Sequence, residues 1–271
     1  MGAKAQVTED DYFNLQIGLG ESQLALEERH FFDVAGYLVL EDLLMPGQVK
    51  EARNVLAGRA PEKGEVLHII EAGGVLEDAM ALPRVLDPVQ AFIWGRQYRL
   101  VGSRALYREA GTSVYLSGAG AVDPRRYARY RCFGDGQFRC LLLTCLIALD
   151  DTEAFCAILS SHKANLPHPY EGVEPGQIPP LRKIALRAGS AVLYTESLSH
   201  LVAPPESGTQ VWLAYQYGPS YMVDWPGCEP AAALRQRLAA DELKAHLLLP
   251  PYYHPEGAQT KKEKQGRNGP D

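Results

Sequence analysis

The chain has 271 residues, 46% of them hydrophobic, with a formal net charge of -6 and a sequence pI of about 5.7. The acidic balance argues against nucleic acid as the main partner, and the length allows a sizeable core in one large domain or two small ones. The longest apolar run, 140–149, is about half of what a membrane-spanning helix needs, and two aspartates follow it.

The start of the sequence and the cysteines favour a soluble, cytoplasmic protein. The first residues, MGAKAQVTEDDYFN, lack the apolar core of a signal peptide. Five cysteines with no CxxC pair fit free buried thiols in a reducing compartment better than a disulfide framework or a zinc site. The sequence has no internal linker and no repeat.

The first third of the chain is predicted to be mainly helical, after a loose lead-in over residues 1–20. Apolar residues recur there at helical spacing. Gly36 follows the first segment as a stop signal, and Pro46 suits the first turn of the next helix. The expected elements are a helix over 21–33, a strand over 37–40, a helix from 46 to about 56, and helices over 75–81 and 85–94.

From residue 97 onward the pattern changes to short strands separated by Gly, Pro, Asp or Ser corners. Such a series after a helical preface predicts a closed or sandwiched antiparallel fold with helices packed outside. A last helix over 230–248 precedes a polar tail, 251–271, that is too poor in apolar residues to fold. We therefore expect one domain over 21–250. The expected strands cover 98–107, 114–116, 138–149, 154–159, 181–186, 191–195 and 211–217.

The stretch 189–217 has the pattern of a strand, a polar corner and a second strand, and the corner carries Glu196 and His200. If the corner stays extended, the two side chains share one face, because strand side chains repeat every two residues. A carboxylate and an imidazole that face one cavity suffice for proton transfer or for holding a metal. On spacing alone, an ordinary surface pair remains the simpler interpretation.

Arginines gather in the segment 96–139, which carries nine of them, no lysine and three acids. Forked guanidinium groups bind carboxylates and phosphates through two contacts. An anionic small molecule is therefore the expected ligand of this half of the sheet. More than half of these arginines are expected to be ordinary solubilising charge on outward faces.

Several stretches resemble the phytanoyl-CoA dioxygenase family, in that family's order, over roughly residues 28–225. FFDVAGYLVLEDLLMPGQVKEARNVL is similar to its amino-terminal helix, strand and helix. LPRVLDP and IALDDTEAFCAILSSHKANLPHP resemble its central sheet and Gly-Ser-His-Lys corner. AGSAVLYTESLSHLVAPP resembles the strand that brings in the distal iron-binding histidine. The resemblance implies a double-stranded β-helix (jelly roll, cupin-like), so the expected fold is mainly β with N-terminal helices outside and a C-terminal helix.

Members of this family typically bind Fe(II) and 2-oxoglutarate and hydroxylate a small molecule, but their cofactor-binding residues transfer only in part. The family holds iron with two histidines and a carboxylate, the first histidine and the carboxylate coming from an H-x-D element. Here Ser117 takes that histidine position and Ala119 the carboxylate position, while His200 matches the distal histidine. The family's arginine for the far carboxylate of 2-oxoglutarate falls at Gln210 or Val211, neither of which is charged. The resemblance thus implies a degenerate site, and neither cofactor is expected.

We therefore predict an enzyme that uses the cavity for metal-independent, redox-neutral chemistry on an anionic or oxygenated small molecule, such as an isomerisation, cyclisation or related step. Glu196 and His200 are the expected acid and base, and Ser117 is the third expected catalytic residue. The residues expected to hydrogen-bond a substrate carbonyl or hold an acidic group are Tyr115, Tyr194, Arg104 and Gln210.

Two alternatives stay open. The first is an Fe(II)/2-oxoglutarate-dependent oxygenase with displaced ligands, in which Glu196 joins His200 or Asp123 replaces the lost carboxylate. The second is a non-catalytic protein whose cavity binds a small molecule without reaction. Metal content separates the oxygenase from the other two. Convergence of Glu196 and His200 in a pocket, rather than on the surface, separates the enzyme from the non-catalytic protein.

Overall fold

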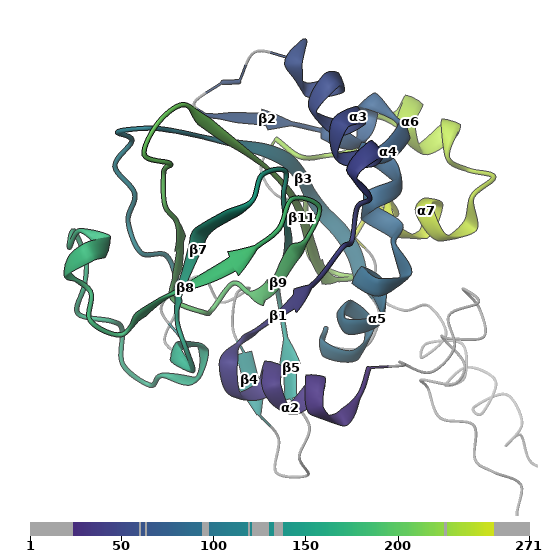
Figure 1. The fold of residues 1–271 in the computed structure, drawn as a ribbon. Helices are drawn as coiled ribbons and strands as arrows, with labels where there is room; N and C mark the ends of the chain where they lie inside the picture. Colours follow the sequence, from purple (N-terminus) through teal and green to yellow (C-terminus); the bar gives the residue numbers. More distant parts are fainter. Residues whose placement is uncertain are drawn as a thin grey trace, which may run out of the picture.

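Antiparallel strands form the centre of the computed structural model, which describes residues 24–59, 61–62, 64–93, 98–118, 120, 130–132, 138–224 and 227–251 (Figure 1). The larger sheet has six strands in the order β1-β9-β6-β11-β3-β2, the smaller has three in the order β10-β7-β8, and β4 pairs with β5 in a separate hairpin. The strands are β1 Tyr37–Leu40, β2 Glu65–Leu67, β3 Tyr98–Glu109, β4 Tyr130–Cys132, β5 Phe138–Cys140, β6 Leu143–Ala148, β7 Thr152–Ile158, β8 Leu181–Leu186, β9 Ala191–Thr195, β10 His200–Val202 and β11 Thr209–Pro219. The expected lead-in over 1–20 and nearly all of the expected tail lie outside the described residues.

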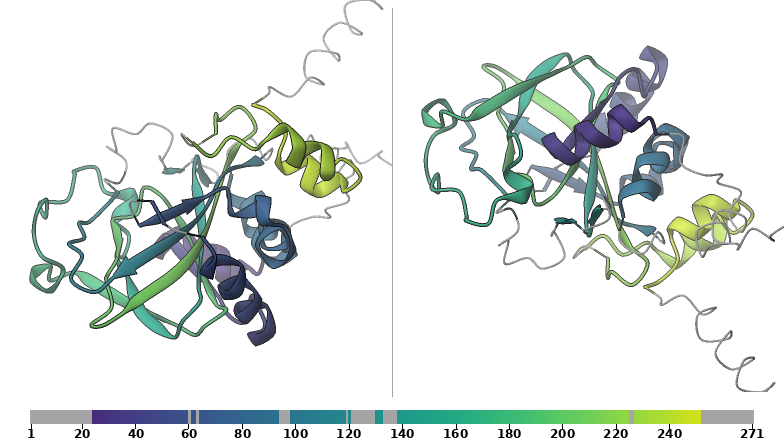
Figure 2. Two further views of the ribbon diagram at one scale, coloured as in Figure 1. Left: turned by 90° about the horizontal axis from the view of Figure 1, so that it is seen from above. Right: turned by 90° about the horizontal axis from the view of Figure 1, so that it is seen from below.

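Helices α3 to α7 lie on one side of the larger sheet, and the smaller sheet lies on the other (Figures 1 and 2). Local sequence signals set their ends: Pro46 opens α3, and Gly36, at a φ of 86°, ends α2 in the left-handed conformation that glycine favours. The helices are α2 Leu26–Ala35, α3 Pro46–Ala57, α4 Gly74–Asp78, α5 Pro83–Phe92, α6 Ala232–Arg237 and α7 Glu242–Leu247, with short 3-10 turns at Ile69–Ala72, Ala79–Ala81, Ser161–Lys163 and Pro175–Gln177.

The side chains of β11 alternate between two hydrophobic cores. Leu213, Tyr215 and Tyr217 pack into the core that β11 shares with the helices, whereas Trp212 and Ala214 pack into the core between the two sheets. This is the period of two that an extended strand imposes. The hydroxyls of Tyr215 and Tyr217 also donate hydrogen bonds to carbonyls of the helical layer, at 2.7 and 2.8 Å. The helices thus fix the larger sheet on one face and leave its other face to line the space between the sheets.

The predicted jelly roll with helices outside is confirmed, but several local predictions are wrong. Residues 114–116 form no strand, and the expected strand over 138–149 is divided into β5 and β6. Within the expected polar corner, residues 200–202 form β10. The expected C-terminal helix is two short helices, because the Asp241 carboxylate accepts a hydrogen bond from the Lys244 amide at 3.0 Å and begins a new one. Among the described residues, no helix is long and apolar enough to cross a membrane.

Candidate active site

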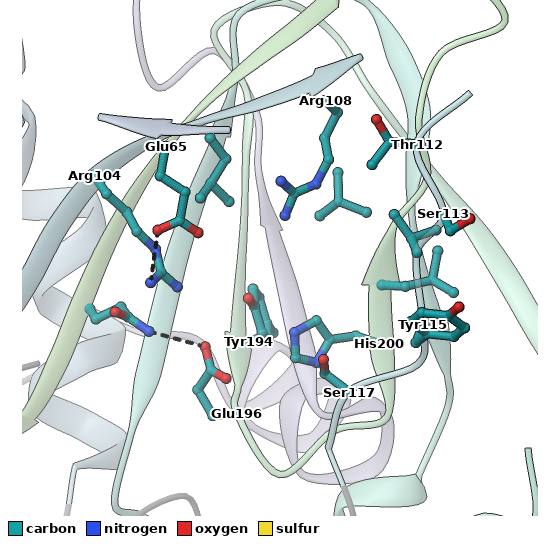
Figure 3. Close-up of a pocket in the computed structure, with 15 residues that line it drawn as sticks. Glu65, Arg104, Arg108, Thr112, Ser113, Tyr115, Ser117, Tyr194, Glu196 and His200 are labelled. Atoms are coloured by element: carbon teal, nitrogen blue, oxygen red, sulfur yellow. Dashed lines mark hydrogen bonds and ion pairs between the residues drawn. The ribbon is translucent and has the colours of Figure 1, made fainter. Parts of the chain in front are cut away.

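A pocket of about 450 Å³ opens between the sheets, beside β3 and the segment 112–117 (Figure 3). This volume is within the range of small-molecule sites. Its walls come from β2, β3, β9, β10, β11 and the segment 112–117. The lining residues are Glu65, Arg104, Leu106, Arg108, Thr112, Ser113, Val114, Tyr115, Ser117, Tyr194, Glu196, His200, Leu201, Val202 and Gln216.

Ser117 and His200 are direct partners across an antiparallel pair in the pocket wall. The amide of each donates a hydrogen bond to the carbonyl of the other, both at 2.8 Å. Side chains of such partners lie on the same face of the pair, with Cβ atoms roughly 5 Å apart. Ser117 therefore occupies the position from which a second side chain would share a ligand with His200.

Hydrogen bonding fixes the imidazole of His200 in one orientation. Its Nδ1 lies 2.7 Å from the Leu198 carbonyl oxygen. A carbonyl can only accept, so in the neutral ring Nδ1 carries the hydrogen and Nε2 the lone pair. The ring packs against Tyr194, with centroids 4.4 Å apart, and His200 is only 7% exposed. A lone pair on a fixed ring suits both a general base and a metal ligand.

Glu196 is buried in the same pocket, with 6% of its surface exposed. Its Oε1 accepts hydrogen bonds from the Thr144 hydroxyl at 2.5 Å and the Gln216 amide at 3.4 Å. Tyr194 lies between Glu196 and His200 in Figure 3. Burial, followed by the charge of Glu196, raises the pKa of Tyr194 well above its usual value. The Tyr194 phenol therefore stays protonated at neutral pH and remains a hydrogen-bond donor.

Glu196 lies in the turn after β9 of the larger sheet, whereas His200 begins β10 of the smaller sheet, so the expected period-two alternation through an extended corner is wrong. Residues 196–199 form a turn in which the Leu198 amide donates to the Thr195 carbonyl at 2.9 Å, and this turn leads from β9 in the larger sheet to β10 in the smaller. Gly118 passes close to the turn: a Cβ added there would lie 2.0 Å from the Leu198 carbonyl oxygen. The two side chains nevertheless line one pocket, while their catalytic roles stay predictions.

Arginines from the basic segment reach the pocket in two places. Arg104 lines it, with Nη1 3.7 Å from Glu65 Oε2, and Arg108 lies four residues further along the same face of β3. Arg99, by contrast, is fully buried and pairs with Asp224 at 2.6 Å, so its role is structural. Other arginines of the segment lie outside the described residues or on the β4-β5 hairpin.

The remaining predicted substrate-binding residues lie differently. Tyr115 stands at the pocket rim and is 61% exposed. Gln210 is not among the lining residues, and its amide donates to the Thr152 hydroxyl at 2.9 Å.

Sequence reasoning assigned no individual role to five polar residues that line the pocket, or to Thr144, which donates a hydrogen bond to Glu196. The five are Glu65, Arg108, Thr112, Ser113 and Gln216. For two of them a signal existed, since Arg108 follows Arg104 and Gln216 follows Ala214 in strict strand alternation. Nothing in the local sequence around Glu65 marks it, because its place depends on the pairing of β2 with β3.

The donors in the pocket bear on metal binding. In the part of the chain that the structure describes, no group of three or more His, Cys, Asp or Glu side chains is placed to hold a metal ion. Ser117 presents a neutral hydroxyl opposite His200. Ala119, at the family's carboxylate position, and Asp123, the suggested replacement, lie outside the described residues.

Comparisons with known proteins identify the fold. No family model matches the sequence, and a search of curated proteins finds no significant match. HygX from Streptomyces hygroscopicus, solved with nickel and 2-oxoglutarate bound, is 25% identical with a TM-score of 0.66, and the match covers 78% of this chain and 94% of HygX. EctD from S. alaskensis, solved with bound Fe, is 19% identical with a TM-score of 0.56 over 73% of this chain and 77% of EctD.

A third similar structure is SnoN, described as a non-heme alpha ketoglutarate dependent epimerase from nogalamycin biosynthesis. It is 18% identical with a TM-score of 0.51, and the match covers 77% of this chain and 85% of SnoN. The chain therefore has the fold of Fe(II)/2-oxoglutarate-dependent oxygenases, as its resemblance to the phytanoyl-CoA dioxygenase family implies.

Proposed function

We propose that the chain is an enzyme that moves protons on an anionic or oxygenated small molecule without a change of oxidation state and without Fe(II) or 2-oxoglutarate. The observation that carries the proposal is the convergence of Glu196, Tyr194 and His200 in one pocket whose wall has Ser117 opposite His200. An isomerisation, epimerisation or cyclisation fits this set of groups. SnoN, described as an alpha ketoglutarate dependent epimerase, is an example of an epimerisation on this fold, although with that cosubstrate.

The donor set of the pocket does not fit the iron site of the superfamily. A facial triad needs two histidines and a carboxylate with open positions, and a serine hydroxyl faces His200 where the second histidine would stand. Glu196 already accepts two hydrogen bonds through Oε1. We therefore assign no step to iron or to 2-oxoglutarate.

Proton transfer in the pocket divides among the named groups. Nε2 of His200 takes a proton from a substrate carbon beside a carbonyl, leaving the electron pair of that C–H bond in an enolate. The protonated Tyr194 and the hydroxyl of Ser117 donate hydrogen bonds to the enolate oxygen. Glu196 is the second proton-transfer group. Returning the proton to the other face or to a neighbouring carbon completes an isomerisation with no net loss of electrons or atoms.

Deuterium uptake tests the reaction class directly. The purified chain, freed of metal with EDTA, is incubated in D2O with a panel of oxo and hydroxy carboxylic acids and their phosphates, and the products are analysed by mass spectrometry. Carbon-bound deuterium without a gain of oxygen is the expected result.

H200A should slow deuterium uptake by roughly 10²–10⁴-fold, as loss of a general base does, and E196Q should slow it as well. H168A, which removes an imidazole outside the pocket, serves as the control. Unchanged uptake in both pocket variants would refute the assignment.

An oxygenase with displaced ligands is the second candidate. HygX, at 25% identity, was solved with nickel and 2-oxoglutarate and also with iron, and Glu196 and His200 line one pocket. Products that gain an oxygen atom, with succinate formed from 2-oxoglutarate, would favour this candidate. Saturable binding without any reaction would favour a non-catalytic binding protein.

A further inference from the structure

Arg108 is a charged side chain of the pocket that has no role in the proposed proton transfer. It extends from β3 into the pocket, on the same strand face as Arg104 (Figure 3). Figure 3 places it at the end of the pocket away from Glu196. Its Cα partner on β11 is Gln210, whose amide donates to Thr152 instead. The β11 partner of Arg108 therefore adds no charge to this end of the pocket.

The two pocket arginines differ in their partners. Arg104 has Glu65 at 3.7 Å. For Arg108, by contrast, no carboxylate among the described residues lies within ion-pair distance. Its Nη1 lies 3.4 Å from the carbonyl of its own neighbour Tyr107, and its Nε is buried without an acceptor in the described structure. The guanidinium group of Arg108 thus has hydrogen-bond donors in the pocket, and no carboxylate of the described residues accepts from them.

Such an arrangement is costly for the protein unless a ligand completes it. Burial lowers the pKa of Arg108, and the positive charge of Arg104 lowers it further against the opposing effect of Glu65, yet an arginine keeps its charge in proteins. A partly buried charge without a partner is unfavourable, and such groups persist mainly at functional sites. Since Arg104 and Glu65 offset one another, the pocket has a positive end at Arg108 and a negative group at Glu196.

We propose that Arg108 is the anchor for an anionic group of the ligand, a carboxylate or a phosphate held by the forked guanidinium. The opposite end of the ligand, which faces Glu196, then carries a hydrogen-bond donor such as a hydroxyl or an ammonium group. This assignment names the substrate class for the proposed proton-transfer reaction and rests on that function for its catalytic meaning. The anion site itself is testable without any turnover.

The test measures binding of acetate, succinate, 2-oxoglutarate and inorganic phosphate to the metal-free chain by isothermal titration calorimetry. Arg108→Met keeps much of the side-chain length and removes the charge, whereas Arg182→Met removes a charge from β8, outside the pocket. We expect saturable binding of at least one anion to the parent chain and to R182M, with a dissociation constant at least about tenfold higher in R108M. If the parent chain binds only phosphate or only the carboxylates, and R108M weakens that binding, the result supports the inference and identifies the anion that the site prefers.

A second variant at the same position distinguishes loss of the anion site from a folding defect in R108M. Arg108→Lys keeps the charge but loses the fork, so it should bind a planar carboxylate more weakly than the parent and more tightly than R108M. Because Arg108 has no carboxylate partner among the described residues and only a long hydrogen bond to the Tyr107 carbonyl, R108M should fold with a melting temperature at or above that of the parent. Equal anion binding by R108M and the parent, or no saturable binding of any probe by the parent, overturns the inference. Deuterium uptake decides the proposed reaction separately, so either idea can fail alone.

Discussion

His162 lies in the segment that leads from β7 to β8 and is fully buried, and this burial makes the stability of the protein depend on pH. Its Nε2 lies 3.0 Å from the Asp33 carbonyl, its ring packs edge-on against Tyr130, and the neighbouring Lys163 pairs with Asp33 at 2.8 Å. Burial lowers the pKa of His162 to about 4. The unfolded chain therefore binds a proton between pH 6.5 and 4 that the folded chain does not.

The contribution of His162 to the free energy of unfolding should accordingly have its full value above pH 6.5. The free energy of unfolding should then fall by about 3 kcal/mol as the pH drops to 4. Urea titrations across this range measure the slope. H162Q should flatten it, whereas H168Q, which leaves His162 in place, should keep it. A slope that is identical in H162Q and the parent would contradict this account.

Thr144 stabilises the carboxylate of Glu196 from the neighbouring strand. Thr144→Val removes the hydroxyl that donates to Glu196 while keeping the shape of the side chain. A buried acceptor then loses a donor, so we expect a loss of roughly 1–3 kcal/mol in the free energy of unfolding. T209V, at an exposed position of β11, should change it by less than about 0.5 kcal/mol. Equal effects of the two substitutions would show that the hydrogen bond to Glu196 adds nothing.

At the scale of elements, the close approach of residues 117–118 to the turn 196–199 assembles the site. Gly118 has a φ of 88°, and a Cβ there would lie 2.0 Å from a backbone oxygen. Gly111 has a similar φ of 79° but nothing within 4 Å of an added Cβ. G111A should therefore cost about 1–2 kcal/mol for the backbone conformation alone, and G118A should cost clearly more, at least about 3 kcal/mol.

Thermal unfolding of both glycine variants, together with anion titration, checks this prediction. G118A should also lose binding in the pocket, since Ser117 and His200 must move apart. If G118A and G111A were equally stable, the turn would tolerate displacement and the pairing of Ser117 with His200 would not depend on it.

The sequence was most informative where local patterns decide the structure. Alternating apolar residues predicted β8, β9 and most of β11, and Pro46 and Gly36 predicted helix ends. β10 was missed because three residues in a polar corner become a strand only through pairing with β7. Residues 114–116 alternate like a strand, yet they form no strand. In the segment 112–117, Ser117 alone pairs with another strand, through its bridge to His200.

The candidate site was foreseen in the same uneven way. Ser117 and His200 could be predicted from the family resemblance, which aligns them with iron-ligand positions. The lack of a carboxylate partner for Arg108 among the described residues could not be predicted. Glu65 lies opposite Leu106 in the β2-β3 register, and its carboxylate pairs with Arg104 and not with Arg108. Such cross-strand neighbours are not encoded in any local stretch of sequence.

For the molecule as a whole, one buried ion pair joins the C-terminal region to the larger sheet. Arg99 on β3 is 0% exposed, pairs with Asp224 at 2.6 Å, and donates to the carbonyls of Leu249 and Met222. Asp224→Asn leaves the buried guanidinium without its counter-charge and should cost roughly 3–5 kcal/mol. Glu41→Gln, in the exposed pair with Arg187, should cost less than about 1 kcal/mol. Chemical denaturation compares the two, and a small effect of D224N would mean that the charge of Asp224 contributes little to holding the C-terminal region on the sheet.

Anaerobic titration of the purified chain with Fe(II) and 2-oxoglutarate tests the central claim most directly. The visible charge-transfer band of the iron chelate and elemental analysis of the recovered protein are the two readouts. We expect no band and no stoichiometric iron, because Ser117 stands opposite His200 and no second histidine is among the described residues that line the pocket. Stoichiometric iron with the band would contradict the account and establish an oxygenase whose ligands have been replaced by other side chains.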